Sequence, residues 1–518
     1  MALVERGDFG SATSANSLKI LHGGLRYIQQ ADFRRMRQSI RERATLLRLA
    51  PHLTRPLPVV VPTYTGLKES RAALWMALRI SEVVGAGLNR ESGRGGGLPP
   101  GRILDRRESL RLFPWIEKEG LTGAALWHDG QAVNSERLTL SFLLSAAEAG
   151  AEMANYLEVT RLLKDGSRIA GARALDRVGG QEVEIRARMV LNAAGPWGGA
   201  IMALGRNSAG APPHSVQALA INLVSRRSLG EMAVGIRSRR KVAQDPVGGG
   251  RRHLFFAPWR DRTLIGTSYR AFTGEPGRDR VTEENLRDLL ADCNQACPGL
   301  GLSWEDLTFY HWGVLPLQGG RRSGARMPLA AEPRILDHGW EDGVEGLVSI
   351  IGVKYTTARL VAEQALDLIF RKLGRNPPPC RTASVPIWGG EESGGESVPS
   401  GVPAGTARRL EEVYGSRRGE VVRRYRNEEG WAAPAAEGCP VLRCEVLRAV
   451  REEMALKLAD VILRRTDLGT AGCPPRPHLV AVARILGEEM GWTEERQVQE
   501  VNDVLKIYAP LPVRTEAV

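Results

Sequence analysis

The first 27 residues constrain the fold of this chain more than any other segment. Ala2-Leu3-Val4 is a short apolar run that ends in the carboxylate of Glu5. Such a run is typical of the second strand of a dinucleotide-binding βαβ unit, in which the acid accepts hydrogen bonds from ribose hydroxyls. The first strand of that unit, with its Gly-x-Gly-x-x-Gly turn, would then lie upstream of Met1. We therefore expect the natural protein to begin about 30 residues earlier.

Seven short motifs follow one another in an order that resembles one known family. They are VERGDF (4–9), TSANSLK (13–19), HGGLRY (22–27), RERATLLRLAPHL (41–53), NAAGPW (192–197), GVKYTT (352–357) and RAVREEMA (448–455). Over nearly its whole length the chain resembles the FAD-dependent glycerol-3-phosphate dehydrogenases, which are quinone-linked respiratory flavoproteins. The resemblance implies FAD as the cofactor, oxidation of glycerol 3-phosphate to dihydroxyacetone phosphate, and ubiquinone or menaquinone as the electron acceptor. Several dispersed motifs in order are more specific than a single glycine-rich match.

The order of the expected elements indicates an α/β fold followed by an α-helical part. We expect a Rossmann-like FAD-binding domain, truncated at its N-terminus, with an antiparallel-sheet substrate domain and a C-terminal helical domain. The expected segments are 1–65, 126–200 and 346–385 for the FAD-binding domain, 66–125 for a helical insertion in the substrate region, 201–345 for the substrate-binding antiparallel sheet, 386–404 for a linker and 405–518 for the helical domain. The linker is rich in Gly, Ser, Glu and Pro, a composition typical of flexible connections.

Local patterns predict individual elements. Asp32 is a candidate N-cap for a helix that ends before Pro51. Lys164-Asp165-Gly166 is a candidate hairpin turn. Residues 216–317 mix short β-runs with a helix, as in an antiparallel substrate-binding sheet. Apolar periodicity predicts further helices over residues 67–88, 138–149, 283–292 and 358–372.

Residues 13–27 carry the densest group of candidate cofactor contacts. A flavin needs hydrogen-bond donors near its pyrophosphate and pyrimidine edge, and small residues where the backbone approaches its rings. Ser14, Ser17 and Lys19 offer donors, and Gly23 and Gly24 allow a close approach. The alternative is a glycine-containing loop with a capping serine. With the resemblance, the predicted cofactor-binding residues are Glu5, Thr13, Ser14, Ser17, Lys19, Leu21, His22, Gly23, Gly24, Val159, Ala194, Gly195, Trp197, Gly352, Lys354 and Thr356.

Four residues are predicted to act in catalysis, namely Arg26, Tyr27, Thr267 and Lys354. Arg26 can hold a phosphate or carboxylate through two hydrogen bonds, and the alternative is a structural ion pair. Lys354 would place a cation beside the N1–C2=O edge of the flavin, where it stabilises negative charge. The alternative for Lys354 is a surface lysine beside a capping threonine. Two interpretations also stay open for His22, which either donates to the flavin or caps a turn.

Three positions depart from the resembled family at the substrate. Leu315 stands where the family has an arginine, Asn222 stands where it has a histidine, and Gly266-Thr267-Ser268-Tyr269 lacks the family's acid. The arginines of the next loop that are candidates to compensate are Arg321, Arg322, Arg326 and Arg334. We expect a small anionic substrate, a polyol phosphate or hydroxy acid, with glycerol 3-phosphate first. The alternatives are another 2-hydroxy acid or a secondary amine as substrate, or a non-catalytic flavoprotein remnant that serves as an interaction module.

The formal net charge of +12 limits the partners of the chain. The charge either forms a cationic face for anionic lipid or substrate, or is spread over solvated faces. No block of Lys and Arg with interleaved aromatic residues predicts nucleic-acid binding. Since no apolar run suits a spanning helix and no secretory pattern begins the chain, we expect a cytoplasmic protein, with peripheral contact at the inner face of the cytoplasmic membrane left open. The six cysteines are expected as free thiols, and no metal site is predicted.

Overall fold

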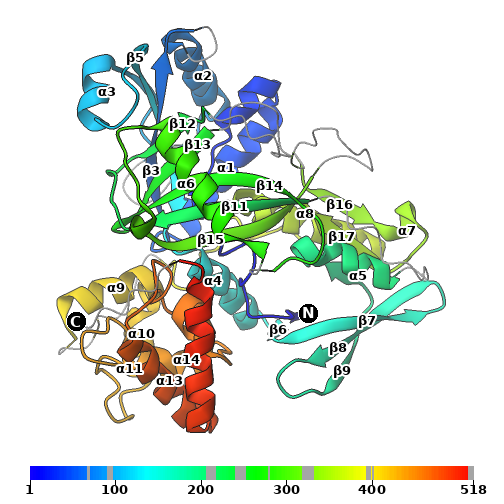
Figure 1. Ribbon diagram of the computed structural model, residues 1–518. Coiled ribbons are helices and arrows are strands. Elements are labelled where there is room, and N and C mark those ends of the chain that lie inside the picture. Colours follow the sequence, from blue (N-terminus) through cyan, green and yellow to red (C-terminus); the bar gives the residue numbers. More distant parts are fainter. Residues whose placement is uncertain are drawn as a thin grey trace.

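A curled nine-stranded sheet forms the centre of the protein (Figure 1). The computed structural model describes residues 1–66, 70–89, 97–205, 217–239, 253–277, 280–317, 329, 332–391, 398 and 402–511. The strands run in the order β15-β11-β14-β13-β12-β3-β5-β2, and β4 pairs with β5. Their bounds are β2 (Ile20–Leu21), β3 (Thr54–Tyr64), β4 (Arg102–Asp105), β5 (Leu121–Ala132), β11 (Gln217–Ser225), β12 (Ala233–Arg237), β13 (His253–Trp259), β14 (Arg262–Phe272) and β15 (Leu307–Pro316).

The smaller sheets contain strands of the expected FAD-binding segments. β1 (Ala2–Val4) is parallel to β6 (Glu152–Ala154), and β10 (Val190–Asn192) is parallel to β17 (Leu347–Ile351). The remaining strands in these small sheets are β16 (Arg334–Asp337), antiparallel to β17, and the meander of β7 (Leu157–Asp165), β8 (Arg168–Asp176) and β9 (Glu182–Arg186). Parallel strands beside an antiparallel sheet agree with the expected fold class. The strand expected before β1 stays a prediction, as do the residue boundaries of the domains.

The expected helices are present, and α8 has the expected bounds, whereas α2, α4 and α6 have shifted ends. Asp32 caps α1 (Phe33–Leu49), because its carboxylate accepts a hydrogen bond from the Arg35 backbone N–H at 2.9 Å. The helix expected over residues 67–88 is shorter: α2 (Arg71–Val84) begins after the Ser70 cap and ends at Gly85, and residues 67–69 lie outside the described ranges. The other elements of this part are η1 (Leu25–Gln30), α3 (Arg106–Leu112), α4 (Ser135–Glu148), η3 (Gly195–Trp197), α5 (Gly198–Gly205), α6 (Glu283–Ala296), η5 (Trp304–Asp306), α7 (His338–Glu341), η6 (Tyr355–Thr357) and α8 (Ala358–Lys372).

The C-terminal helices group together below the nine-stranded sheet in Figure 1. They are α9 (Ala404–Tyr414), η7 (Gly415–Arg417), α10 (Arg418–Arg423), α11 (Arg443–Arg451), α12 (Leu458–Asp460), η8 (Val461–Arg465), α13 (Arg476–Met490) and α14 (Glu494–Tyr508). Trp259 and Phe309 of the sheet belong to the same buried cluster as the side chains of these helices, and the rings of Phe309 and Tyr508 lie 5.3 Å apart. The helical domain therefore shares its core with the sheet. None of the helices in the described ranges combines the length and apolar character needed to cross a bilayer.

The expected linker begins inside this core. Ile387 and Trp388 are buried, and the guanidinium groups of Arg137 and Arg448 lie 5.0 and 4.8 Å from the centroid of the Trp388 ring. The linker over residues 386–404 stays a prediction, and near its start a tryptophan is held between two cations. Most of residues 392–401 lie outside the described ranges.

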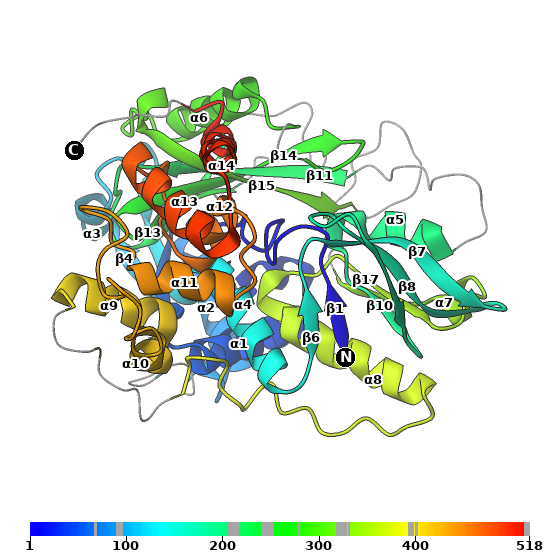
Figure 2. The same cartoon turned by 90° about the horizontal axis from the view of Figure 1, so that it is seen from below.

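Buried ion pairs fasten the segment after β1 to the helical domain. Arg465 donates both Nη groups to the Asp8 carboxylate, at 2.8 and 2.7 Å. Arg464 also contacts Asp8, and Arg137 of α4 pairs with Glu453 at 2.8 Å. Figure 2 shows the short β1 strand beside β6. The C-terminal domain therefore holds the start of the nucleotide-binding segment in place.

Candidate functional site

Two of the predicted catalytic residues, Tyr27 and Lys354, lie 327 residues apart in the sequence but form a hydrogen bond. Tyr27 lies on η1, which begins after Gly24, and Lys354 precedes η6. The Lys354 ammonium donates a hydrogen bond of 2.6 Å to the Tyr27 phenolic oxygen. The ammonium also lies 4.9 Å from the centroid of the Tyr27 ring. Lys354 is exposed, and its role in catalysis stays a prediction.

Arg26 adds an unpaired cation on the same short helix. Its side chain is exposed, and its guanidinium makes no hydrogen bond or ion pair to any residue in the described part of the chain. The alternative of a structural ion pair is therefore not observed there. A free guanidinium offers two parallel N–H groups to a phosphate or carboxylate.

The loop before η1 is held by a buried carboxylate. Asp129 of β5 accepts the Gly23 backbone N–H and an Nη1 hydrogen of Arg43, each at 2.7 Å. A Cβ added at Gly23 would collide with the Arg43 guanidinium, so glycine is required here. Burial alone would raise the pKa of Asp129, but His22 and Arg43 hold it well below its ordinary value. Asp129 therefore stays ionised.

His22 and Asp129 differ in how well the sequence revealed them. His22 Nδ1 lies 3.6 Å from the Asp129 carboxylate, a contact that neither of its two expected roles included. A role for His22 toward the flavin stays a prediction. Asp129 was missed, because no spacing in the sequence connects residue 129 with residues 22 and 23.

The Lys19 side chain is not available at the surface of the site. Its buried ammonium contacts the two carboxylate oxygens of Glu136 at 2.9 and 2.8 Å and Ser135 Oγ at 2.7 Å. Burial lowers the pKa of Lys19, and the Glu136 charge opposes that shift. This internal pair gives Lys19 a structural role in place of the predicted role as a donor to the cofactor.

Residues 13–21 lie against β15 and β5. His311 Nδ1 lies 2.9 Å from the carbonyl oxygen of Ser17, and a Cβ added at Gly313 would approach Thr13 Cγ2 to 3.0 Å. Ser14 is exposed, whereas the Leu21 side chain is buried in β2. The backbone of this loop is therefore fixed by the sheet, and Leu21 can meet a ligand only through its backbone.

The acid that follows β1 lies beside the first residues of β7. The Glu5 carboxylate accepts the Gly7 N–H at 2.9 Å, and the Glu5 carbonyl accepts the Leu157 N–H at 2.8 Å. Burial raises the pKa of Glu5. Val159 is on the same strand β7. Glu5 and Val159 thus come from distant segments to one place, as expected for the ribose and adenine half of a dinucleotide.

The residues after β10 and β17 also fit a dinucleotide. Gly195 and Gly352 have φ values of 53° and 77°, in the left-handed region that favours glycine. Ala194 precedes Gly195, and its N–H donates to the Asn192 side chain at 3.2 Å. Trp197 Nε1 is buried without an acceptor in the described ranges, and the Arg6 guanidinium lies 4.2 Å from the centroid of its ring.

The helix start that follows β17 provides further hydrogen-bond donors. Thr356 is buried in η6, which leads directly into α8. Backbone N–H groups at such a start can face an anion such as a pyrophosphate. With the orphaned Trp197 donor, two open glycine turns, the acid Glu5 and the cation Lys354, the donor set fits a flavin dinucleotide.

Asn222, one of the positions that depart from the resembled family, pairs with Thr267. Thr267 Oγ1 donates to Asn222 Oδ1 at 2.7 Å, between the paired strands β14 and β11. Leu315 is half-buried on β15, opposite Ala218. Of the arginines considered as replacements, Arg334 is exposed on β16. The others, Arg321, Arg322 and Arg326, lie outside the described residues.

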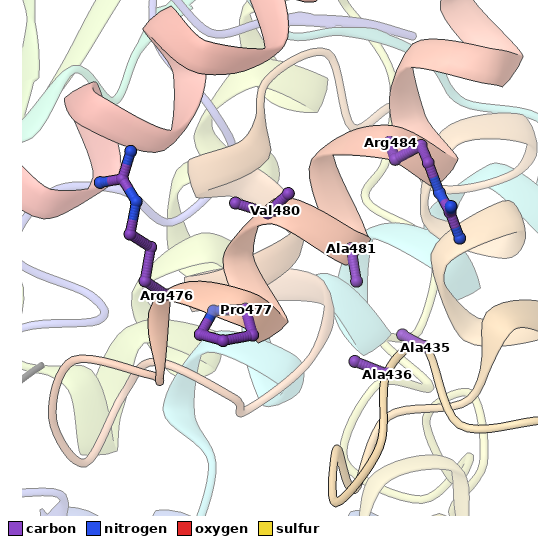
Figure 3. Close-up of a pocket in the computed structure, with 7 residues that line it drawn as sticks. All are labelled: Ala435, Ala436, Arg476, Pro477, Val480, Ala481 and Arg484. Atoms are coloured by element: carbon purple, nitrogen blue, oxygen red, sulfur yellow. The ribbon is translucent and has the colours of Figure 1, made fainter. Parts of the chain in front are cut away.

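A separate hollow of about 510 Å³ lies on the C-terminal domain (Figure 3). Arg476 and Arg484 of α13 stand at its ends, and Ala435 and Ala436 form its opposite wall. It shares no residue with the site described above, so it carries no argument about the reaction.

Comparisons with known proteins show which families and structures this chain is similar to. Residues 1–367 match the family model described as FAD dependent oxidoreductase, and residues 380–497 match the C-terminal domain of alpha-glycerophosphate oxidase. The chain is 29% identical to a glycerol-3-phosphate dehydrogenase of Synechocystis sp., over 97% of this chain and 91% of that protein. It is 28% identical to the human mitochondrial glycerol-3-phosphate dehydrogenase, over 98% of this chain and 69% of that protein.

A solved structure is similar over the whole chain. The glycerol-3-phosphate dehydrogenase from Bacillus halodurans, complexed with FAD, has a TM-score of 0.71 and 25% identity, over 99% of this chain and 91% of that one. The expected cofactor and the expected resemblance are therefore confirmed. Since the first family model covers more than half of its length, this chain belongs to the FAD dependent oxidoreductase family.

Proposed function

We propose that this protein oxidises glycerol 3-phosphate to dihydroxyacetone phosphate and passes the electrons to a quinone. The observation that carries the proposal is the group of Arg26, Tyr27 and Lys354, in which an unpaired guanidinium shares a helix with one member of a hydrogen-bonded pair. The names of the relatives support the same substrate. Because quinones dissolve in the bilayer, the protein would work at the inner face of the cytoplasmic membrane.

Arg26, Tyr27 and Lys354 have different roles toward the substrate. Arg26 binds the phosphate through its two parallel N–H groups. Lys354 uses one ammonium hydrogen for Tyr27 and keeps two for other acceptors, while the Tyr27 hydroxyl keeps its own hydrogen to donate. FAD, when bound, accepts two electrons with the hydrogen of the oxidised carbon. The substrate hydroxyl releases its proton to solvent water, and the Lys354 charge would stabilise the negative charge of the reduced cofactor.

A second candidate substrate is a 2-hydroxy acid or a secondary amine. A phosphate monoester carries a charge of about −1.5 to −2 at pH 7, whereas a carboxylate carries one negative charge. Asn222, Tyr269 and Leu315 stand at positions where the resembled family has a histidine, an acid and an arginine. Within the described residues, the charge of the Arg26 guanidinium alone would balance a carboxylate more completely than a phosphate.

An anaerobic titration of the FAD-loaded protein distinguishes these substrates. We expect glycerol 3-phosphate to bleach the oxidised flavin band, and Arg26→Gln to raise the concentration needed by about tenfold or more. Bleaching by a 2-hydroxy acid or amine alone would refute the proposal and favour the second candidate. Bleaching by dithionite but by no organic donor would favour a non-catalytic flavoprotein.

The electron acceptor is tested by reoxidising the bleached protein. A soluble quinone analogue should restore the oxidised band within the mixing time, whereas oxygen should act slowly. Rapid reoxidation by oxygen with no response to the quinone would contradict the acceptor and indicate an oxidase.

A further inference from the structure

A line of hydrogen-bonded side chains crosses the small sheet that contains β10 and β17 (Figure 2). It begins at Asp342, at the end of α7, where the carboxylate lies 3.2 Å from His338 Nδ1. His338 Nε2 lies 2.8 Å from Ser349 Oγ, and Asn192 Nδ2 donates to the same oxygen at 3.0 Å. Asn192 and Ser349 are paired across parallel strands, so their side chains stand on one face of the sheet. We call these four residues the Asn192 network.

Three members of the Asn192 network are buried. Asn192, His338 and Ser349 are 4%, 2% and 0% exposed, whereas the Asp342 side chain is 20% exposed. A carboxylate can only accept, so Nδ1 of the neutral His338 ring carries the hydrogen and Nε2 accepts the Ser349 hydroxyl. The donors then all point one way, from Asn192 toward Asp342, and each buried polar atom along the line has a partner, as buried polar groups require.

A carboxylate, an imidazole and a hydroxyl in this order also occur in serine hydrolases. A hydrolase nucleophile must reach the reacting carbon of its substrate. Ser349 is fully buried, and its oxygen already accepts a hydrogen bond from Asn192. The geometry therefore does not suit attack on a substrate, and the network acts through Asn192.

Asn192 holds the turn that contains several of the predicted cofactor residues. Its Oδ1 accepts the Ala194 N–H at 3.2 Å, and its Nδ2 donates to the Gly198 carbonyl at 2.9 Å. These two hydrogen bonds bracket η3, between β10 and α5. On the other strand, β17 leads from Ser349 to the glycine turn at Gly352. The Asn192 network therefore joins the two turns that fit a dinucleotide.

We propose that His338 and Ser349 are positioning residues for FAD, which they serve by fixing the orientation of the Asn192 amide. A serine hydroxyl can either donate to an amide oxygen or accept from an amide nitrogen. Because His338 takes the Ser349 hydrogen, Ser349 can only accept, and the Asn192 oxygen stays on the Ala194 N–H. The inference rests on the predicted FAD-binding turns, and it is independent of the substrate and electron acceptor proposed above.

The dissociation constant for FAD tests the proposal with neither substrate nor acceptor present. The holoprotein is diluted in steps, and free FAD is separated by ultrafiltration. We expect Ser349→Ala and His338→Leu each to raise the Kd for FAD about tenfold, because a buried amide or hydroxyl loses its partner and the turn after β10 loosens. Kd values equal to that of the wild type would overturn the proposal.

Ser238→Ala is the matched control for a merely structural effect. Ser238 is also 0% exposed, and it donates to the buried carboxylate of Asp292 on α6 at 2.6 Å. Neither α6 nor the end of β12, which Ser238 follows, carries a predicted cofactor residue. This variant should lower the urea midpoint but leave the Kd for FAD unchanged. An equal rise of the Kd in Ser238→Ala and Ser349→Ala would overturn the proposal.

Asp342→Ala keeps the test decisive if the buried variants do not fold. Because this end of the network is partly exposed, water replaces some of the lost interaction, and we expect the Kd to rise about threefold. Glu341→Ala, an exposed neighbour on α7, should leave the Kd unchanged. An unchanged Kd in Asp342→Ala would overturn the proposal. A flavin that glycerol 3-phosphate does not bleach, with these Kd differences intact, would refute the proposed function alone.

Discussion

Replacing Asp8 with alanine removes the carboxylate that joins the nucleotide-binding segment to the C-terminal domain. Asp8 is 2% exposed. Its oxygens accept two hydrogen bonds from Arg465, at 2.8 and 2.7 Å, and one from Asn155 Nδ2 at 2.9 Å. Arg464 is a further partner. Asp8→Ala leaves two buried guanidinium groups without this counter-ion.

The expected loss of unfolding free energy depends on the contacts that Arg464 and Arg465 keep after the substitution. Breaking a buried ion pair by removing one partner costs about 3–5 kcal/mol of unfolding free energy. Arg464 keeps Asp460 at 2.7 Å, and Arg465 keeps the Glu453 carbonyl at 2.7 Å. We therefore expect Asp8→Ala to lose about 3 kcal/mol, near the lower end of that range.

Urea unfolding at pH 7, followed by far-UV circular dichroism on FAD-loaded protein, measures this loss. The control is Asp503→Ala on α14, where the carboxylate accepts from Lys506 at 2.8 Å and both side chains are largely exposed. Exposed pairs contribute about 1 kcal/mol or less. If Asp8→Ala loses no more stability than the control, the ion pairs of Asp8 with Arg464 and Arg465 do not fasten the nucleotide-binding segment to the C-terminal domain.

The same carboxylate predicts a pH dependence. Burial alone would raise the pKa of Asp8, but Arg464 and Arg465 lower it well below its ordinary value. Because the folded pKa lies below the unfolded value of about 3.9, the stabilisation is present above that pH and is lost as the pH falls toward the folded pKa. The wild type should therefore lose stability more steeply than Asp8→Ala when the pH is lowered from 5 to 3, and parallel curves would contradict this.

Three further substitutions test other parts of the site. Gly23→Ala places a Cβ against the Arg43 guanidinium and should lower the thermal midpoint through about 1–3 kcal/mol of overpacking; an unchanged midpoint would mean that the loop is loosely held. Lys19→Met leaves Glu136 buried without its cation and should cost about 3–5 kcal/mol in urea unfolding, whereas a loss below 1 kcal/mol would show that water reaches the carboxylate. Leu315→Arg should lower the KM for glycerol 3-phosphate by about tenfold, and an unchanged KM would place this side chain away from the phosphate.

Local patterns were sufficient for much of the fold. Asp32 caps α1 as expected, and a hairpin joins β7 and β8 as expected, although its turn falls at Gly166 and Ser167, after Lys164 and Asp165 of β7. These features depend on contacts within a few residues, which the sequence displays directly. The ends of α2 were less well predicted, because apolar residues continue past the Gly85 cap and periodicity does not mark where a helix ends.

The candidate site could be predicted as a set of residues but not as a set of contacts. The motifs at 22–27 and 352–357 were enough to single out Arg26, Tyr27 and Lys354. They did not reveal that Lys354 donates to Tyr27, nor that Lys19 is held by Glu136.

The sequence by itself determined the class of protein, the identity of the cofactor and the local elements, since motif residues and periodicity act over short distances. The tertiary structure alone decided which charges meet. The partners of Tyr27, Lys19 and Gly23 lie 327, 117 and 106 residues away. Such pairs depend on how the sheet and the helices pack, and a buried side chain takes whichever partner that packing brings within hydrogen-bond distance.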